Sequence, residues 1–247
     1  MEKILESNTH EKLDDKTLIN IISLIEKNNL LINNRYTQNK IYISPIRINS
    51  AINKCTIQSY RDVYKTYFKE YDRKNNFNMN CIILNIFYSA SLQPIFYDCF
   101  TELLHLMYTN YNHKEKKDFF TIISKVFVHL FITYKNNTIN GSSYDKFCFQ
   151  MKEKKRIIGS YIIFTLLSKK ISKMKTLFDI QFANILKKCQ KLNILTEVLI
   201  NIIPVLPKNV LKKKKVKIIK CYQKISMDKK NKRNSLLLLN VIEKYLN

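Results

Sequence analysis

Lysines at regular spacing in residues 208–227 are the side chains of this sequence best suited to a specific chemistry, the binding of phosphate groups. The apolar residues that share one helix face there are Leu211, Ile218, Ile219, Tyr222 and Ile225. We expect that face to turn toward the core. The basic residues on the opposite face, or just beyond the next turn, are Lys213, Lys217, Lys220, Lys224, Lys229, Lys230, Lys232 and Arg233. Lysine meets phosphate as a point charge, so these residues predict a surface that binds RNA with little sequence preference.

The distribution of charge along the chain supports a polyanionic partner for the C-terminal part. The net charge is +24, and residues 151–247 carry 24 Lys and Arg against 5 Asp and Glu. Nucleic acid is favoured over a membrane surface because no segment combines the basic run with exposed aromatic residues on one amphipathic helix. The alternative is a solvated lysine surface enriched by an AT-rich coding genome.

Groups that could carry catalysis or hold a metal do not form any familiar pattern in the sequence. Two isolated glycines cannot build a phosphate-cradling loop. The four histidines are isolated, and the six cysteines form no Cys-x-x-Cys pair. We therefore expect no enzyme, no metal and no cofactor.

Targeting signals are not evident in the sequence. The N-terminus MEKILESNTHEKLDD is too polar for a signal peptide, and the longest apolar stretch, 157–167, is too short to span a bilayer. We expect a cytoplasmic protein with no membrane partner, in the host cytoplasm if the chain is viral.

Helices are the elements expected to position the basic residues, because glycines and prolines are too few for a turn-rich β fold. Residues 12–32 predict an N-terminal amphipathic helix, and 33–40 a linker before a domain at 41–247. Within that domain, apolar periodicity predicts ten helices at about 45–54, 57–71, 79–92, 95–109, 115–134, 153–171, 174–188, 190–203, 208–227 and 233–246. The break at 135–152 predicts a mobile surface loop, and Gly159, inside a helix, predicts close approach of a neighbouring helix.

Short breaks between these segments favour antiparallel neighbours. Pairs of such helices repeat at roughly 40 residues, the period of HEAT-type repeats. The predicted fold is therefore an all-α solenoid of about five antiparallel helical hairpins.

One stretch, 83–96, carries a more specific pattern in Ile86, Phe87, Ala90, Pro94 and Phe96. These residues resemble a signature of the middle domain of eukaryotic translation initiation factor 4 gamma, a HEAT-type family. The segments 47–60, 152–170 and 232–245 resemble other parts of that domain in the same order.

The resemblance implies a translation-initiation scaffold that docks a DEAD-box RNA helicase and contacts RNA. By this resemblance, Ile52, Cys55 and Tyr60 would contact the helicase. The alternative is that these three residues belong to the core of the first hairpin. Other middle domains of this kind would act in splicing, mRNA decay or nuclear cap binding. A different alternative is a basic helical protein that packages nucleic acid.

A cap-binding protein is a further possible partner. Its anchor would have the pattern Tyr-x-x-x-x-Leu-apolar, which Tyr161, Leu166 and Leu167 match by letter and Tyr36, Ile41 and Tyr42 match in degraded form. We expect the first match to be coincidental, because it falls in an apolar helix.

Overall fold

The computed structural model describes residues 43–71, 76–89, 94–136, 143–189, 193–228 and 232–246. The chain divides into two units, Met1–Ser44 and Pro45–Asn247, and the following account concerns the second. The predicted N-terminal helix at 12–32, the linker at 33–40 and the degraded cap-binding match at 36–42 lie outside the described residues.

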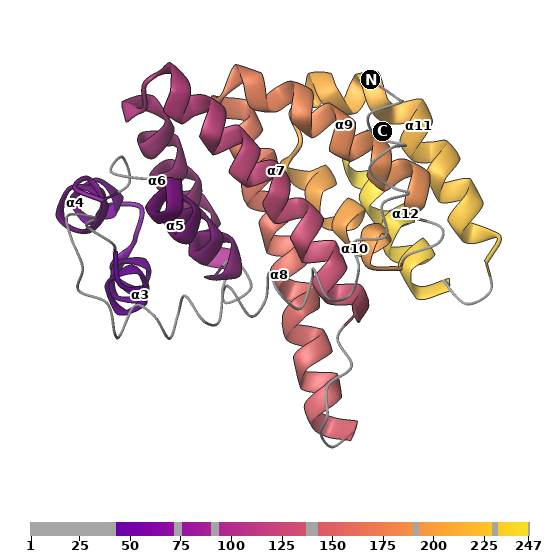
Figure 1. Cartoon of the computed structure of the whole chain (residues 1–247). Coiled ribbons are helices and arrows are strands. Elements are labelled where there is room, and N and C mark those ends of the chain that lie inside the picture. The colour runs from indigo at the N-terminus through magenta and orange to yellow at the C-terminus, as the bar shows by residue number, and fades with distance from the viewer. Residues whose placement is uncertain are drawn as a thin grey trace, which may run out of the picture. The chain divides into compact units, whose positions relative to one another are not determined.

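Helices account for all regular structure in the described ranges, which contain no strand (Figure 1). The α-helices are α3 (Pro45–Lys54), α4 (Tyr60–Val63), α5 (Asn76–Ser89), α6 (Tyr97–Asn110), α7 (His113–Asn136), α8 (Ser143–Lys170), α9 (Ser172–Lys188), α10 (Asn193–Ile202), α11 (Lys208–Ser226) and α12 (Lys232–Leu246). Short turns of other pitch are the π-helical η1 (Tyr64–Phe68) and the 3-10 helices η2 (Pro94–Phe96) and η3 (Ile203–Val205). The all-α prediction is confirmed.

Helix α8 begins well before its predicted start, so the loop prediction at 135–152 is wrong for most of its length. Residues 143–150 are helical, and all of them except Phe149 are exposed. This first part of α8 therefore has no buried apolar stripe from which periodicity could identify a helix. Asp145 in the first turn is favourably placed in the field of the helix dipole. The segment extends a helix whose later turns are buried.

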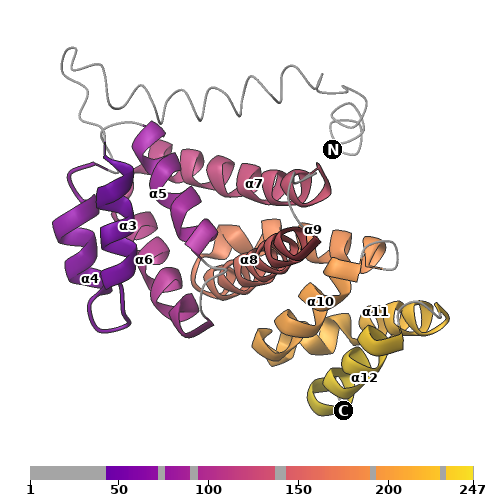
Figure 2. The ribbon, with the colours of Figure 1, turned by 90° about the horizontal axis from the view of Figure 1, so that it is seen from below.

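Packing joins helices that are two places apart in the chain as well as sequential neighbours, and the pairs α8–α9 and α11–α12 are among the most extensive sequential contacts. One series of such contacts runs through α4, α6, α8, α10 and α12, another joins α3, α5 and α7, and α9 contacts α11. Figure 2 shows α3 beside α5 and α4 beside α6. The pairs α7–α8, α9–α10 and α11–α12 are also in contact, so the two series are joined along their length.

Aromatic side chains form a continuous buried row through the middle of this unit. The ring of Phe127 lies 5.8 Å from that of Phe87 and 4.6 Å from that of Phe164. Phe178 continues the row 5.9 Å from Phe164. Gly159 is buried in α8, and the next residue, Ser160, donates a hydrogen bond of 3.3 Å to the backbone oxygen of Phe87 on α5. Helix α5 therefore lies against α8 at the residue next to Gly159.

Candidate nucleic-acid interface

Helix α11 separates apolar and basic residues onto opposite faces, as its sequence predicts. Leu211, Ile218 and Ile225 are buried, whereas Ile219 and Tyr222 lie half-buried at the margins. Cys221 is buried as well, which the predicted apolar face did not include. The four predicted lysines on the other face are all exposed, and they are named the α11 stripe here: Lys213, Lys217, Lys220 and Lys224.

The α11 stripe is unfavourable for the helix that carries it. Lys213 and Lys217, like Lys220 and Lys224, lie four residues apart, so two like-charged pairs face each other across one helical turn. Each such pair destabilises a helix by roughly 0.2–0.5 kcal/mol. The pattern therefore is not explained by helix stability, and a bound polyanion would remove the repulsion.

No carboxylate within the described ranges forms an ion pair with a lysine of the α11 stripe. Among the described residues, the ion pair of this helix joins Lys214 Nζ to Asp179 Oδ1 on α9 at 3.0 Å, and Lys214 is outside the stripe. Lys232 and Arg233 are exposed in the first turn of α12, where cations oppose the helix dipole. Lys229 and Lys230 lie outside the described residues.

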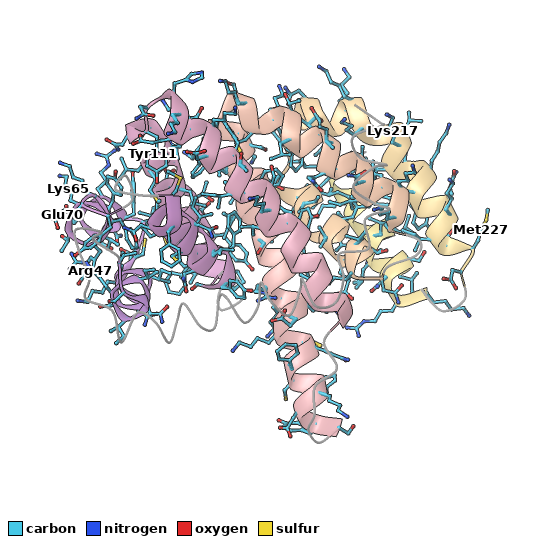
Figure 3. The ribbon with its side chains drawn as sticks, in the orientation of Figure 1. Arg47, Lys65, Glu70, Tyr111, Lys217 and Met227 are labelled. Atoms are coloured by element: carbon cyan, nitrogen blue, oxygen red, sulfur yellow. The ribbon has the colours of Figure 1, made fainter. Side chains whose placement is uncertain are left out.

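Two apolar side chains are exposed on and just after α11. Val216 is 64% exposed and Met227, in the turn that follows the helix, is 82% exposed. Figure 3 shows Lys217 and Met227 projecting from this end of the unit. An interface formed by this surface would therefore offer apolar contact next to its positive charge.

The structure places two of the three predicted helicase-binding residues inside the core. Ile52 is 5% exposed and Cys55 is fully buried, and the Sγ of Cys99 on α6 lies 3.5 Å from the backbone oxygen of Cys55. A docking surface cannot be centred on side chains with so little exposed area, so that assignment is corrected for these two residues. Tyr60 is half-buried at the surface. An exposed apolar neighbour, Ile57, was missed because periodicity does not indicate which side of a turn faces solvent.

A second basic surface, beside Tyr60, was not predicted. Arg61, Lys65 and Lys69 line a groove between the α4–η1 segment and α6. Their spacing of four residues is visible in the sequence, but two acidic residues, Asp62 and Glu70, lie in the same segment and conceal the local excess of positive charge.

The better match to a cap-binding anchor is part of the core of α8. Tyr161 is 1% exposed and Leu167 is fully buried, while Leu166 is half-buried. Burial raises the pKa of the Tyr161 hydroxyl. These side chains are therefore held inside the protein, which agrees with the expectation that this match is coincidental.

Two of the buried cysteines, Cys55 and Cys221, are poor nucleophiles. A hydrogen bond with Cys189 and burial raise the pKa of the Cys221 thiol, and a hydrogen bond with Cys99 and burial do the same for Cys55. Such thiols stay protonated at neutral pH. Among the residues that the structure describes, no three His, Cys, Asp or Glu side chains are grouped as a metal site would require. Within the same residues, no helix has both the length and the apolar character needed to cross a bilayer.

Comparisons of the chain with protein-family models, with curated proteins and with solved structures found no match.

Proposed function

We propose that this chain is a non-enzymatic, cytoplasmic helical scaffold that binds RNA through the α11 stripe. The observation that carries the proposal is the set of four exposed lysines on one helix face. No carboxylate of the described residues forms an ion pair with any of these four lysines. Lysines in this arrangement contact phosphates, and phosphate contacts dominate affinity for nucleic acid without reading sequence.

The arrangement of the scaffold in this proposal is a HEAT-like solenoid of about five antiparallel hairpins. The contacts between helices two places apart, through α4, α6, α8, α10 and α12 and through α3, α5 and α7, support it, because stacked hairpins bury their apolar faces against their neighbours in the same way. Such an array would present the α11 stripe on a rigid support.

The biological role that we propose is that of a translation-initiation scaffold for a DEAD-box RNA helicase. The support is the resemblance of 83–96 and 152–170 to the middle domain of initiation factor 4 gamma, together with the packing of these two stretches. Ile86 is fully buried, and Ser160 bonds to Phe87 across the two helices. Splicing, mRNA decay and nuclear cap binding would use the same scaffold with another helicase, and nucleic-acid packaging would use no helicase.

The RNA proposal is tested by replacing all four lysines of the α11 stripe with glutamine and measuring RNA affinity against salt. Neutralising about four phosphates of a single strand gives a slope of log affinity against log salt near −3, from ~0.7 per phosphate. The quadruple variant should have a flatter slope and weaker binding. The matched control replaces four exposed lysines of α9 with glutamine: Lys173, Lys175, Lys187 and Lys188. If stripe and control variants bind alike, the stripe is only a solvated face.

The helicase proposal is tested at exposed rather than buried residues of the first hairpin. Ile57 is 51% exposed, so Ile57→Asp should leave the fold intact and weaken co-purification with a DEAD-box helicase and stimulation of its ATPase. Ile180→Asp on α9, where the side chain is 43% exposed, is the control. Absence of any helicase in purifications of the unaltered chain from its native cell would favour the packaging role.

A further inference from the structure

The groove beside Tyr60 is a candidate binding site separate from the α11 stripe. It has a volume of about 550 Å³ and lies between α4 and η1 on one side and α6 with the end of α8 on the other. Its lining includes Tyr60, Arg61, Lys65, Lys69, Glu102 and Lys170. A volume of this size suits a small ligand or a short segment of a polymer.

The charge of the groove is positive, and most of it is uncompensated. Lys170 Nζ and Glu102 Oε1 form an ion pair of 2.7 Å. Among the described residues that line the groove, Glu102 is the one carboxylate, so the other three cations have no carboxylate of their own there. Arg61, Lys65 and Lys69 are exposed, and no ion pair joins them to a carboxylate of the described residues. Asp62 and Glu70 belong to the same segment but are not part of the lining.

The three cations form a row, because they are spaced four residues apart along α4, η1 and the residue that follows it. Neighbours at this spacing on a helix lie roughly 5–6 Å apart. The row includes the π-helical turn Tyr64–Phe68, and such turns occur often at functional sites. A linear array of three cations fits a chain of phosphates better than a single carboxylate, because one carboxylate cannot pair with all three side chains.

Tyr60 supplies an aromatic group at one end of this row. Its phenolic oxygen accepts a hydrogen bond of 3.2 Å from Arg61 Nε, which holds the two side chains together. The ring is half-buried and lines the groove. A basic groove with an aromatic platform is the combination that binds single-stranded nucleic acid, because an unpaired base stacks on the ring while the cations follow the backbone.

We infer that this groove binds a short segment of single-stranded RNA, with the phosphates along Arg61, Lys65 and Lys69 and one base stacked on Tyr60. The inference rests on the proposed RNA-binding function and adds a second contact to it. Lys65 and Lys217 lie at opposite ends of the helical array, so the two surfaces are physically separate (Figure 3).

The test uses the full chain and a fluorescein-labelled oligouridine of about eight nucleotides, the lower half of the range for single-strand sites. Binding is measured by anisotropy in the background of the glutamine quadruple variant of the α11 stripe. Adding Arg61→Gln, Lys65→Gln and Lys69→Gln should flatten the salt slope by about 2, from ~0.7 per phosphate. Between 50 and 200 mM salt, the protein with an intact groove should therefore lose about 20-fold more affinity than the groove variant loses.

The matched control for this triple variant changes three exposed lysines of α7 to glutamine: Lys114, Lys117 and Lys125. Circular dichroism verifies that each variant is folded. Equal slopes for the groove variant and the control would overturn the inference. Tyr60→Ala should weaken binding at least ~5-fold, from a stacking contribution of about 1 kcal/mol or more, while Tyr60→Phe should retain it.

Failures of the two proposals are distinguishable when stripe and groove variants are measured singly and together. If the stripe variant alone abolishes oligouridine binding, the groove inference is wrong and the stripe proposal stands. If only the groove variant changes the slope, the stripe proposal is wrong. If polyglutamate displaces the oligouridine from the stripe variant as well as unlabelled oligouridine of equal charge does, the groove is a site for acidic peptides and the RNA inference falls.

Discussion

Replacing Arg156 by leucine should destabilise the protein, and the size of the loss of stability should depend on pH. Arg156 forms an ion pair with Glu153 one turn earlier on α8, and the two side chains are only 5% and 9% exposed. The guanidinium carbon also lies 4.2 Å from the centre of the Tyr88 ring on α5. The Nε of Arg156 has no hydrogen-bond partner among the described residues, so the pair and the ring are its principal contacts.

The magnitude follows from the burial of the partner that remains. Removing one member of a buried pair costs about 3–5 kcal/mol, because the other charge stays where water cannot solvate it. Loss of the cation–π contact contributes up to about 2 kcal/mol in a desolvated site. Protonation of Glu153 offsets part of this cost. At pH 7.5 we therefore expect Arg156→Leu to lower the free energy of unfolding by about 3 kcal/mol or more.

The sign of the pH dependence is set by Glu153. Burial raises the pKa of its carboxyl, and the charge and hydrogen bond of Arg156 oppose that rise. Without the arginine the pKa rises further. A raised pKa in the folded state contributes stability that is fully present below the unfolded value of 4.5 and is lost as pH rises through the folded value. Relative to the unaltered protein at the same pH, the Arg156→Leu variant should therefore lose less free energy of unfolding at pH 4.5 than at pH 7.5.

Urea unfolding of the full chain, followed by circular dichroism at both pH values, measures these differences. The double variant Glu153→Leu/Arg156→Leu is the control, and it should be more stable than Arg156→Leu at pH 7.5 because no buried charge is left unpaired. The reasoning is refuted if the single variant loses equally at both pH values, or if the double variant is no more stable than the single one.

Three further substitutions test other parts of the fold. Phe164→Ala should cost about 3–5 kcal/mol in urea unfolding, because the ring is fully buried, whereas Phe147→Ala on the exposed start of α8 should cost almost nothing. Gly159→Val should cost about 1–3 kcal/mol by overpacking α8 beside α5, and a more stable variant would contradict the close packing there. Lys54→Met should raise the pKa of Tyr67 in a phenolate absorbance titration, since the 2.7 Å hydrogen bond from Lys54 lowers it, and an unchanged titration would show that the bond is not maintained in solution.

Sequence periodicity predicted the helices where each one buries an apolar stripe of its own. Helix α3 begins and ends where predicted, since Pro45 suits the first turn of a helix and Ile48, Ala51 and Ile52 form its buried face. The start of α8 was missed because residues 143–150 carry no such stripe. The π-helical turn at 64–68 was also unpredictable, since it changes the helical register without any change in residue type.

The two predicted sites differ in outcome because periodicity shows which face of a helix is apolar but not what covers that face. A helix with neighbours on one side only must expose its charged face, so the α11 stripe followed from the sequence. Periodicity identifies an apolar face but not whether another helix covers it. Ile52 and Cys55 lie on a face that is covered, and the buried Cys99 of α6 approaches Cys55 there.

If both proposed surfaces bind RNA, the distance between the α11 stripe and the Tyr60 groove would give the helical array a role beyond support. In the proposed RNA-binding function each surface alone would hold a few phosphates, which would give weak binding that salt readily reverses. An RNA strand long enough to reach both surfaces binds the second one intramolecularly, so its affinity exceeds that of either contact without any new interaction. A rigid spacer fixes the separation of the two sites and so sets the strand length that gains most, and the buried aromatic row from Phe87 to Phe178 lies within the helices that join them. Destabilising that row should therefore weaken binding of long RNA before it weakens binding of an octamer.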